Sequence, residues 1–361
     1  MKKLLIVLLV FIPINVFATS GVSEEFTYDL YRARILDVET TTEVINGVKS
    51  VSQIATAEII NRDKKGEEVE IYNFLSGDPV YDMELKENTI ATINYDGSEF
   101  HFIGYDNFRP MVLLVALFAG LLLLIGGIKG MKALVALIIT ISLIVAVMVP
   151  LLLRGLSPIF VSVLISSIAT LLTFLIISGR NKKTLIATLG TTTGLISGGA
   201  IAYIFGMLFR LTGFSSNDAT MLLYLPNQIN FDFRGLLFAG IIIGALGASM
   251  DVSISIASSL NELKVQKPNI KANELVKSGF NIGKDIMGTM INTLVLAYVG
   301  GSLTTLLIFV GFNTSFYHIA NLDFFATEVV RAVAGSVGLL IAIPATIMFF
   351  VIFNFKKEEI L

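Results

Sequence analysis

Two patterns of apolar and polar residues divide the chain at Arg109-Pro110. From Glu25 to Asn107, apolar and polar residues alternate and turn residues interrupt the alternation, which is typical of β-strands with one buried face. After Pro110, long apolar runs are separated by short polar connections. The pattern therefore predicts a β-rich head that is followed by an α-helical membrane domain.

The head is expected to contain five or six strands, near 26–37, 38–45, 48–60, 67–74, 80–93 and 99–105. Asn46-Gly47 lies between two of them and suits a two-residue hairpin turn, because both residues tolerate a positive φ. The preferred architecture is a small closed barrel that resembles an oligonucleotide-binding (OB) fold, and an open sandwich is the alternative.

The second part of the chain holds seven apolar runs that approach or exceed the length of a membrane-spanning helix, which is about 20 residues. They lie near 111–128, 133–150, 158–178, 184–208, 235–260, 286–311 and 328–353. The predicted fold class is a polytopic α-helical membrane bundle of seven spans (residues 109–355) with an N-terminal all-β head (19–108) and a short tail (356–361). Between the fifth and sixth runs, residues 270–280 are expected to form a separate amphipathic helix on the membrane surface.

The first 18 residues resemble a secretory signal peptide. Met1-Lys2-Lys3 precedes an apolar run from Leu4 to Phe17, which is shorter than a membrane span, and Ala18 precedes the expected cleavage point. We therefore expect the head to be exported from the cytoplasm. The alternative, an uncleaved anchor, leaves the topology of the later segments unchanged.

Basic residues are unevenly divided between the two sides of the predicted bundle. With the head outside, the cytoplasmic connections and the tail hold twelve of them: Lys129, Lys132, Arg180, Lys182, Lys183, Lys264, Lys267, Lys271, Lys277, Lys284, Lys356 and Lys357. The opposite connections hold three, Arg154, Arg210 and Arg234. This positive-inside bias predicts a plasma-membrane protein with an extracytoplasmic head and a cytoplasmic C-terminus.

The composition is that of an integral membrane protein, because 54% of the residues are hydrophobic and only 15% are charged. The head is acidic, with 18 Asp or Glu against 7 Lys or Arg in residues 19–108, which argues against nucleic acid as a ligand. The chain has no cysteine and two histidines, so we expect no disulfide, no metal centre and no cofactor.

Polar residues and glycines share one face of the fifth predicted span. They are spaced by three or four residues: Gly240, Gly244, Gly247, Asp251, Ser255, Ser258 and Glu262. A carboxylate inside an apolar span is costly in lipid and usually faces protein or water. The spacing therefore identifies Asp251 as the centre of a candidate site.

The sixth span has a similar stripe of Asn281, Asp285, Gly288 and Asn292, and Asn292 is expected at the depth of Asp251. Threonines of the fourth span are expected to add hydroxyl groups at a similar depth. We predict an intramembrane polar site between these three spans, formed by Asp251, Ser255, Ser258, Asn292, Asp285 and Thr191. A purely structural hydrogen-bonded contact is the alternative.

Small residues indicate where the spans pack closely, because lipid provides no hydrophobic force between helices. The fourth and fifth spans carry Gly190, Gly194, Gly198, Gly240, Gly244 and Gly247 at helical spacing. The alternative is a locally unwound helix that exposes its backbone to a substrate. At the outer edge of the seventh span, Glu328 and Arg331 are three residues apart and are expected to form an ion pair, unless both extend to the interface.

Segments 244–262 (GALGASMDVSISIASSLNE) and 279–294 (GFNIGKDIMGTMINTL) resemble the signature region of the YibE/F family of bacterial multi-pass membrane proteins. Residues 77–86 also resemble the extracytoplasmic part of that family, so the similarity covers essentially the whole mature chain. The resemblance implies an envelope protein with a small head and a helical bundle. It implies no substrate, because the family is named without an established activity.

Sequence features of the enzyme classes considered are absent. No glycine-rich phosphate loop ends in Lys-Ser or Lys-Thr, no Gly-x-Gly-Asp motif of an aspartyl protease occurs, and neither histidine is placed to activate Ser255 or Ser258. We therefore predict a protein that is not an enzyme, namely a transporter or permease-like component that moves a small solute or ion through the polar site. The alternative is a non-transporting envelope assembly or signalling protein whose head binds a partner. The expected partners are the lipid bilayer and either other envelope proteins or a second copy of the chain.

Overall fold

The computed structural model describes residues 29–45, 48–78, 82–215, 217–224, 231–312 and 315–355. The predicted signal peptide at 1–18, the Asn46-Gly47 turn and the tail at 356–361 lie outside these residues. Contacts divide the chain into two compact units with a boundary between Leu124 and Ile125. One unit contains the head and the other contains the helical bundle.

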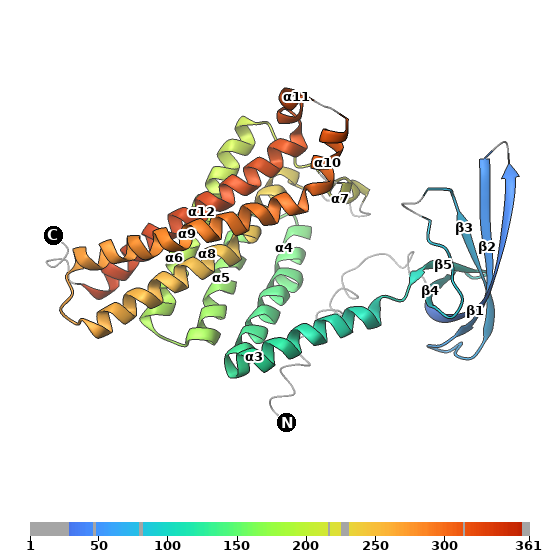
Figure 1. Ribbon diagram of the computed structural model, residues 1–361, viewed down its shortest axis with the longest axis horizontal. Coiled ribbons are helices and arrows are strands. Elements are labelled where there is room, and N and C mark those ends of the chain that lie inside the picture. Colours follow the sequence, from blue (N-terminus) through green and yellow to red (C-terminus); the bar gives the residue numbers. More distant parts are fainter. Residues whose placement is uncertain are drawn as a thin grey trace. The chain divides into compact units, whose positions relative to one another are not determined.

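The head is a closed barrel of five strands (Figure 1). The strands are β1 (Asp29–Ile45), β2 (Val48–Ile59), β3 (Glu68–Leu75), β4 (Ile90–Tyr95) and β5 (Phe100–Tyr105). They follow the order β1-β2-β3-β5-β4 around the barrel, with β3 and β5 parallel and the other neighbours antiparallel. The predicted small closed barrel is confirmed, and the alternative of an open sandwich is wrong.

Two predicted strands differ from the observed ones. The runs 26–37 and 38–45 form the single strand β1, because the irregularity between Ile35 and Asp37 is a shift of register that does not end the strand. Within the run 80–93, residues 82–89 are not a strand, and β4 begins at Ile90. Ahead of β4, the N–H of Leu85 donates to Oε1 of Gln53 at 2.7 Å. This backbone group is therefore paired with a side chain and not with the backbone of a neighbouring strand.

The alternation of residue types produces the interior of the barrel, because successive side chains of a strand point to opposite faces. Ala33, Ile35, Ala57 and other apolar residues of the strands are completely buried. Gln53 and Asn73 are also buried, and Nδ2 of Asn73 donates to Oε1 of Gln53 at 3.0 Å. The interior of the barrel is thus apolar, and its two buried amides are hydrogen-bonded.

Among the described residues, five helical segments are long and apolar enough to cross a membrane, and a bent pair of helices is a sixth candidate. The segments are Phe108–Leu153, α5 (Pro158–Ser178), α6 (Lys182–Leu208), α8 (Phe233–Gln266) and α12 (Asp323–Asn354). The bent pair is α9 (Ala272–Gly301) and α10 (Leu303–Gly311), with an angle of 60°. Short helices occupy the connections, namely α7 (Asn217–Met221), η4 (Leu222–Tyr224) and α11 (Phe316–Ala320).

The first apolar segment contains a break. It consists of α3 (Phe108–Leu143), the π-helix η3 (Ile144–Met148) and α4 (Val149–Leu153). Within α3, Gly127 has a non-helical conformation with φ 51° and ψ −128°. Glycine adopts a positive φ without the strain of a side chain, so helical geometry is interrupted at Gly127, near the end of the predicted span 111–128.

Helices α5, α6, α8, α9 and α12 pack into one bundle (Figure 1). Helix α12 contacts α6, α8 and α9, and α8 also contacts α5, α6 and α9. The buried cluster between them includes Ile256, Leu275 and Phe350. The separate surface helix predicted at 270–280 is wrong, because α9 is continuous from Ala272 and its Leu275 is buried in this cluster.

Candidate functional site

Helix α12 lies against the three predicted packing glycines of α6, Gly190, Gly194 and Gly198. A Cβ atom at Gly194 would stand 2.6 Å from the carbonyl oxygen of Gly338, and one at Gly198 would stand 3.0 Å from that of Ala334. These distances leave no room for a side chain, so the two backbones approach closely, as small residues allow between membrane helices. These glycines therefore serve packing within the bundle.

The glycines of α8 have different surroundings. Gly240, Gly244 and Gly247 are exposed, and a Cβ atom at Gly240 or Gly247 would meet no atom within 4 Å. At Gly244 the nearest atom to that position is the hydroxyl oxygen of Tyr298 on α9, at 2.6 Å. Within the described chain, no helix packs on the stripe at Gly240 and Gly247.

The same face of α8 continues through Asp251, which is exposed near the middle of the helix. Ser255 and Ser258 follow on this face and are half-buried, and Glu262 is exposed. The structure thus keeps the predicted stripe together on one surface of α8. That surface faces outward from the bundle.

Thr191 lies on the other side of α8. Its hydroxyl oxygen is 2.9 Å from the carbonyl oxygen of Ala187, to which it donates, and 3.5 Å from the carbonyl oxygen of Ser249. Ser249 and Ser253 are completely buried and lie on the face of α8 opposite Asp251. The structure therefore does not bring Thr191 together with Asp251.

Helix α9 carries the second predicted stripe on its exposed side. Asp285, Gly288 and Asn292 are exposed, and a Cβ atom at Gly288 would meet nothing within 4 Å. Helices α8 and α9 are consecutive and lie side by side (Figure 1). Because Tyr298 stands beside Gly244 and the helices are antiparallel, residue 251 is level with residue 291.

The two predicted partners therefore lie at about the same depth on neighbouring helices. Within the part of the chain that the structure describes, the side chains of Asp251, Asp285 and Asn292 make no hydrogen bond or ion pair. These residues belong to a polar surface on α8 and α9 and do not form an enclosed cavity. No three His, Cys, Asp or Glu side chains among the described residues are grouped to hold a metal ion.

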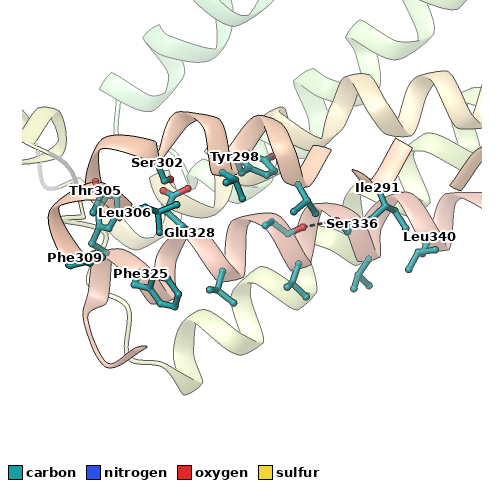
Figure 2. Close-up of a pocket in the computed structure, with 17 residues that line it drawn as sticks. Ile291, Tyr298, Ser302, Thr305, Leu306, Phe309, Phe325, Glu328, Ser336 and Leu340 are labelled. Carbon is teal, nitrogen blue, oxygen red and sulfur yellow. Dashed lines mark hydrogen bonds between the residues drawn. The ribbon is translucent and has the colours of Figure 1, made fainter. Parts of the chain in front are cut away.

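A groove of about 540 Å³ lies between α9, α10 and α12 (Figure 2). Phe309 and Phe325 lie near one end of the groove and Ile291 and Leu340 near the other, with Glu328 and Ser302 between them. Oε1 of Glu328 and Nη1 of Arg331 form an ion pair at 2.8 Å, so the two residues of the predicted outer pair are in contact.

The break between α9 and α10 borders this groove, and no sequence pattern considered above predicted it. Tyr298 also lines the groove, and its buried hydroxyl group has no hydrogen-bond partner in the structure. The available signal was the consecutive Gly300 and Gly301 inside a predicted span, since such glycines permit a discontinuous helix.

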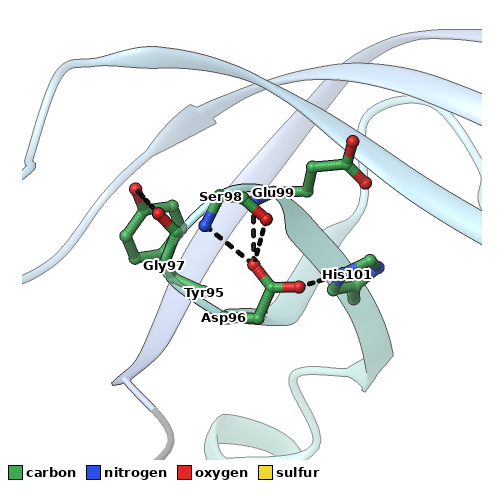
Figure 3. A network of polar contacts seen from close by, with 6 residues as sticks. All are labelled: Tyr95, Asp96, Gly97, Ser98, Glu99 and His101. Carbon is green, nitrogen blue, oxygen red and sulfur yellow. Dashed lines mark hydrogen bonds and ion pairs between the residues drawn. The ribbon is translucent and has the colours of Figure 1, made fainter.

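In the head, Asp96 holds the turn between β4 and β5 (Figure 3). Its Oδ1 accepts hydrogen bonds from the backbone N–H groups of Ser98 at 2.8 Å and Glu99 at 2.9 Å, and Oδ2 is 2.9 Å from Nε2 of His101. The N–H groups of Glu99 and Ser98, followed by the side chains of His101 and Ser98, hold the pKa of Asp96 well below its usual range. This carboxylate is occupied by its own turn and serves local structure.

Comparison with known proteins gives one result for the helical part. The family model described as YibE/F-like protein matches residues 114–356. This segment begins within α3 and extends beyond the end of α12, and the β-barrel head and residues 77–86 lie outside it. No curated protein and no solved structure matches the chain.

Proposed function

This chain belongs to the YibE/F-like protein family, and we propose that it is a multi-pass plasma-membrane protein that moves a small solute or ion along the polar face of α8 and α9. In this proposal the protein is a transporter or permease-like component and performs no chemistry on the solute. The supporting observation is Asp251, an exposed carboxylate near the middle of an apolar helix that has no hydrogen-bond or ion-pair partner among the described residues.

The energetic argument starts from the cost of a carboxylate in hydrocarbon, which is about 2.5–3.5 kcal/mol at the centre of a membrane helix. Such a residue is tolerated where it faces water or a polar group. Asn292 lies at a similar depth, and Ser255 and Ser258 continue the polar surface toward the end of α8. A proton, a cation or a polar solute is the class of ligand that these oxygen atoms suit.

The proposal includes seven spans behind a signal peptide. The segment Phe108–Leu153 has 46 residues, or ~69 Å of helix at ~1.5 Å per residue, which is about twice the hydrocarbon thickness. A turn at Gly127 therefore allows two crossings, and the pair α9–α10 supplies one bent crossing. The excess of basic residues in the connections of one side supports an extracytoplasmic head and a cytoplasmic C-terminus.

Replacement of Asp251 by asparagine tests the site. The purified protein is reconstituted in liposomes that contain a pH-sensitive dye, and proton flux is measured with gradients of Na⁺, K⁺ or Mg²⁺. We expect Asp251→Asn to lower the flux of the transported ion by about tenfold or more. A tenfold change corresponds to a free-energy difference of ~1.4 kcal/mol.

The matched control is Asp232→Asn on the same helix. Asp232 caps α8 by accepting a hydrogen bond from the N–H of Gly235 at 2.8 Å, and asparagine caps a helix as well as aspartate does. This variant also removes one carboxylate but should retain the flux of the wild type. An Asp251→Asn protein that is folded and transports at the wild-type rate would contradict the proposed site.

A further inference from the structure

We propose that a second copy of this chain covers the open face of the bundle, which is defined by Gly240, Gly247, Asp251, Asp285, Gly288 and Asn292. These residues are exposed on the neighbouring helices α8 and α9. Each copy presents the same surface to the other, as in a two-fold symmetric dimer. The polar site is thereby enclosed between two chains.

The first argument compares glycines within one molecule. Gly194 and Gly198 of α6 are in close contact with the backbone of α12. Gly240, Gly247 and Gly288 have the same small size on helices of the same bundle, yet a Cβ atom at each would meet nothing within 4 Å. The open face therefore carries the small residues that are typical of a close contact between helices, but within the described chain no helix packs on these glycines.

The second argument is the polar groups on the same surface. Asp251, Asp285 and Asn292 are exposed and have no hydrogen-bond or ion-pair partner among the described residues. Hydrocarbon offers neither donors nor acceptors to such groups, so lipid is an unfavourable neighbour for them. A protein surface that carries polar side chains satisfies them.

The identity of the partner follows from the chemistry of the face. The part of α3 before Gly127 offers such a face no partner, because residues 111–126 contain no polar side chain. A second copy brings amide groups that both donate and accept, and the exposed ammonium group of Lys284 next to Asp285. The open face is therefore complementary to itself in charge and in hydrogen bonding.

This inference rests on the proposed function for the role of the site, whereas the pairing itself rests on the exposure of the face. It changes where the transported ion would pass, because the path then lies between two copies and not within one. Asp251 of each chain would line it. A single copy would have an incomplete site.

Disulfide cross-linking tests the pairing directly, because the natural chain has no cysteine. Single cysteines are introduced at Gly240, Gly247 and Gly288, where there is space for a side chain, and the membranes are oxidised. We expect at least one of these variants to form a covalent dimer several-fold more than the control Ile196→Cys. Ile196 is 52% exposed on α6, at the depth of Gly244.

Three results would overturn the inference. The first is that all three open-face cysteines cross-link no more than the control. The second is that a water-soluble maleimide labels them completely in membranes, which indicates an open aqueous surface. The third is an intramolecular disulfide between Gly247→Cys and a second cysteine at Ala116, which places this part of α3 on the face.

The outcomes for function and pairing are separable. If Asp251→Asn transports normally and the cross-links form, the proposed transport site fails and the dimer stands. If transport depends on Asp251 but no cross-link forms, the site stands and the dimer fails.

Discussion

At the scale of single residues, α8 carries polar side chains on two opposite faces, one exposed and one buried. Asp251, Ser255 and Ser258 share one face, because residues three or four apart lie on the same side of an α-helix. Serines also occur on the opposite face, at Ser249 and Ser253, and these are the ones that are completely buried. Because both faces of α8 carry polar residues, polarity does not tell which face packs against other helices. The direction in which Asp251 points therefore depends on tertiary contacts that helical spacing does not encode.

Asp96 provides a prediction about acid. Its pKa is lowered in the folded head, so the stability contributed by its ionised form is present above the ordinary pKa of about 3.9 and is lost as the pH falls toward the folded value. In the full-length protein we expect the hydrogen-exchange protection of Ser98 and Glu99 to decline below about pH 4. Asp96→Asn should lower this protection at pH 7 and weaken the decline.

The control for this experiment is Asp37→Asn, which removes an exposed carboxylate of β1 outside the turn between β4 and β5. It should leave the protection of Ser98 and Glu99 unchanged. The same pH profile in wild type and Asp96→Asn would contradict the assigned role of the carboxylate.

At the scale of elements, sequence patterns predicted helices best where strong breakers stand at both ends. The run 158–178 coincides with α5, because Pro158 begins it and Gly179 follows it with a φ of 81°. Residues 270–280 were separated from the next run by their charges, yet neither proline nor an unwound glycine interrupts the helix there, and α9 continues. Charge marks the depth of a helix in the membrane and does not end it.

Glycine substitutions test the packing of elements. A Cβ atom at Gly194 would stand 2.6 Å from the carbonyl oxygen of Gly338 and 2.8 Å from Cβ of Ala342, so Gly194→Ala forces α6 and α12 apart. We expect a loss of stability of about 1–3 kcal/mol, which is typical of overpacking. Gly120→Ala of α3 meets nothing within 4 Å and should be neutral or slightly stabilising, because alanine favours helix.

Thermal unfolding of the two variants in detergent measures this difference. Gly194→Ala should unfold at a lower temperature than the wild type, and Gly120→Ala should not. Equal unfolding temperatures for both variants would show that the contact between α6 and α12 is not as close as described.

At the scale of the whole molecule, the two patterns of the sequence correspond to two separate units. Alternation over residues 25–107 predicted strands with one buried face, which allowed a closed barrel or an open sandwich, and the pairing of β1 with β4 closes the barrel. The apolar runs identified the helices of the bundle, but not the exposure of its most polar face. Asp251 and Asn292 on that face have no hydrogen-bond or ion-pair partner within the part of one chain that the structure describes.

Removal of the head distinguishes the two functions considered for the chain. If the bundle is the transporter, a protein that lacks residues 22–106 should retain ion flux in liposomes, because the helices that carry Asp251 belong to the other compact unit. The flux should still fall when Asp251→Asn is combined with the deletion. If flux is lost while the open-face cysteines still cross-link, the bundle is intact and the head is required. That outcome would favour an envelope assembly or signalling protein, in which the acidic barrel binds a partner and the bundle is its anchor.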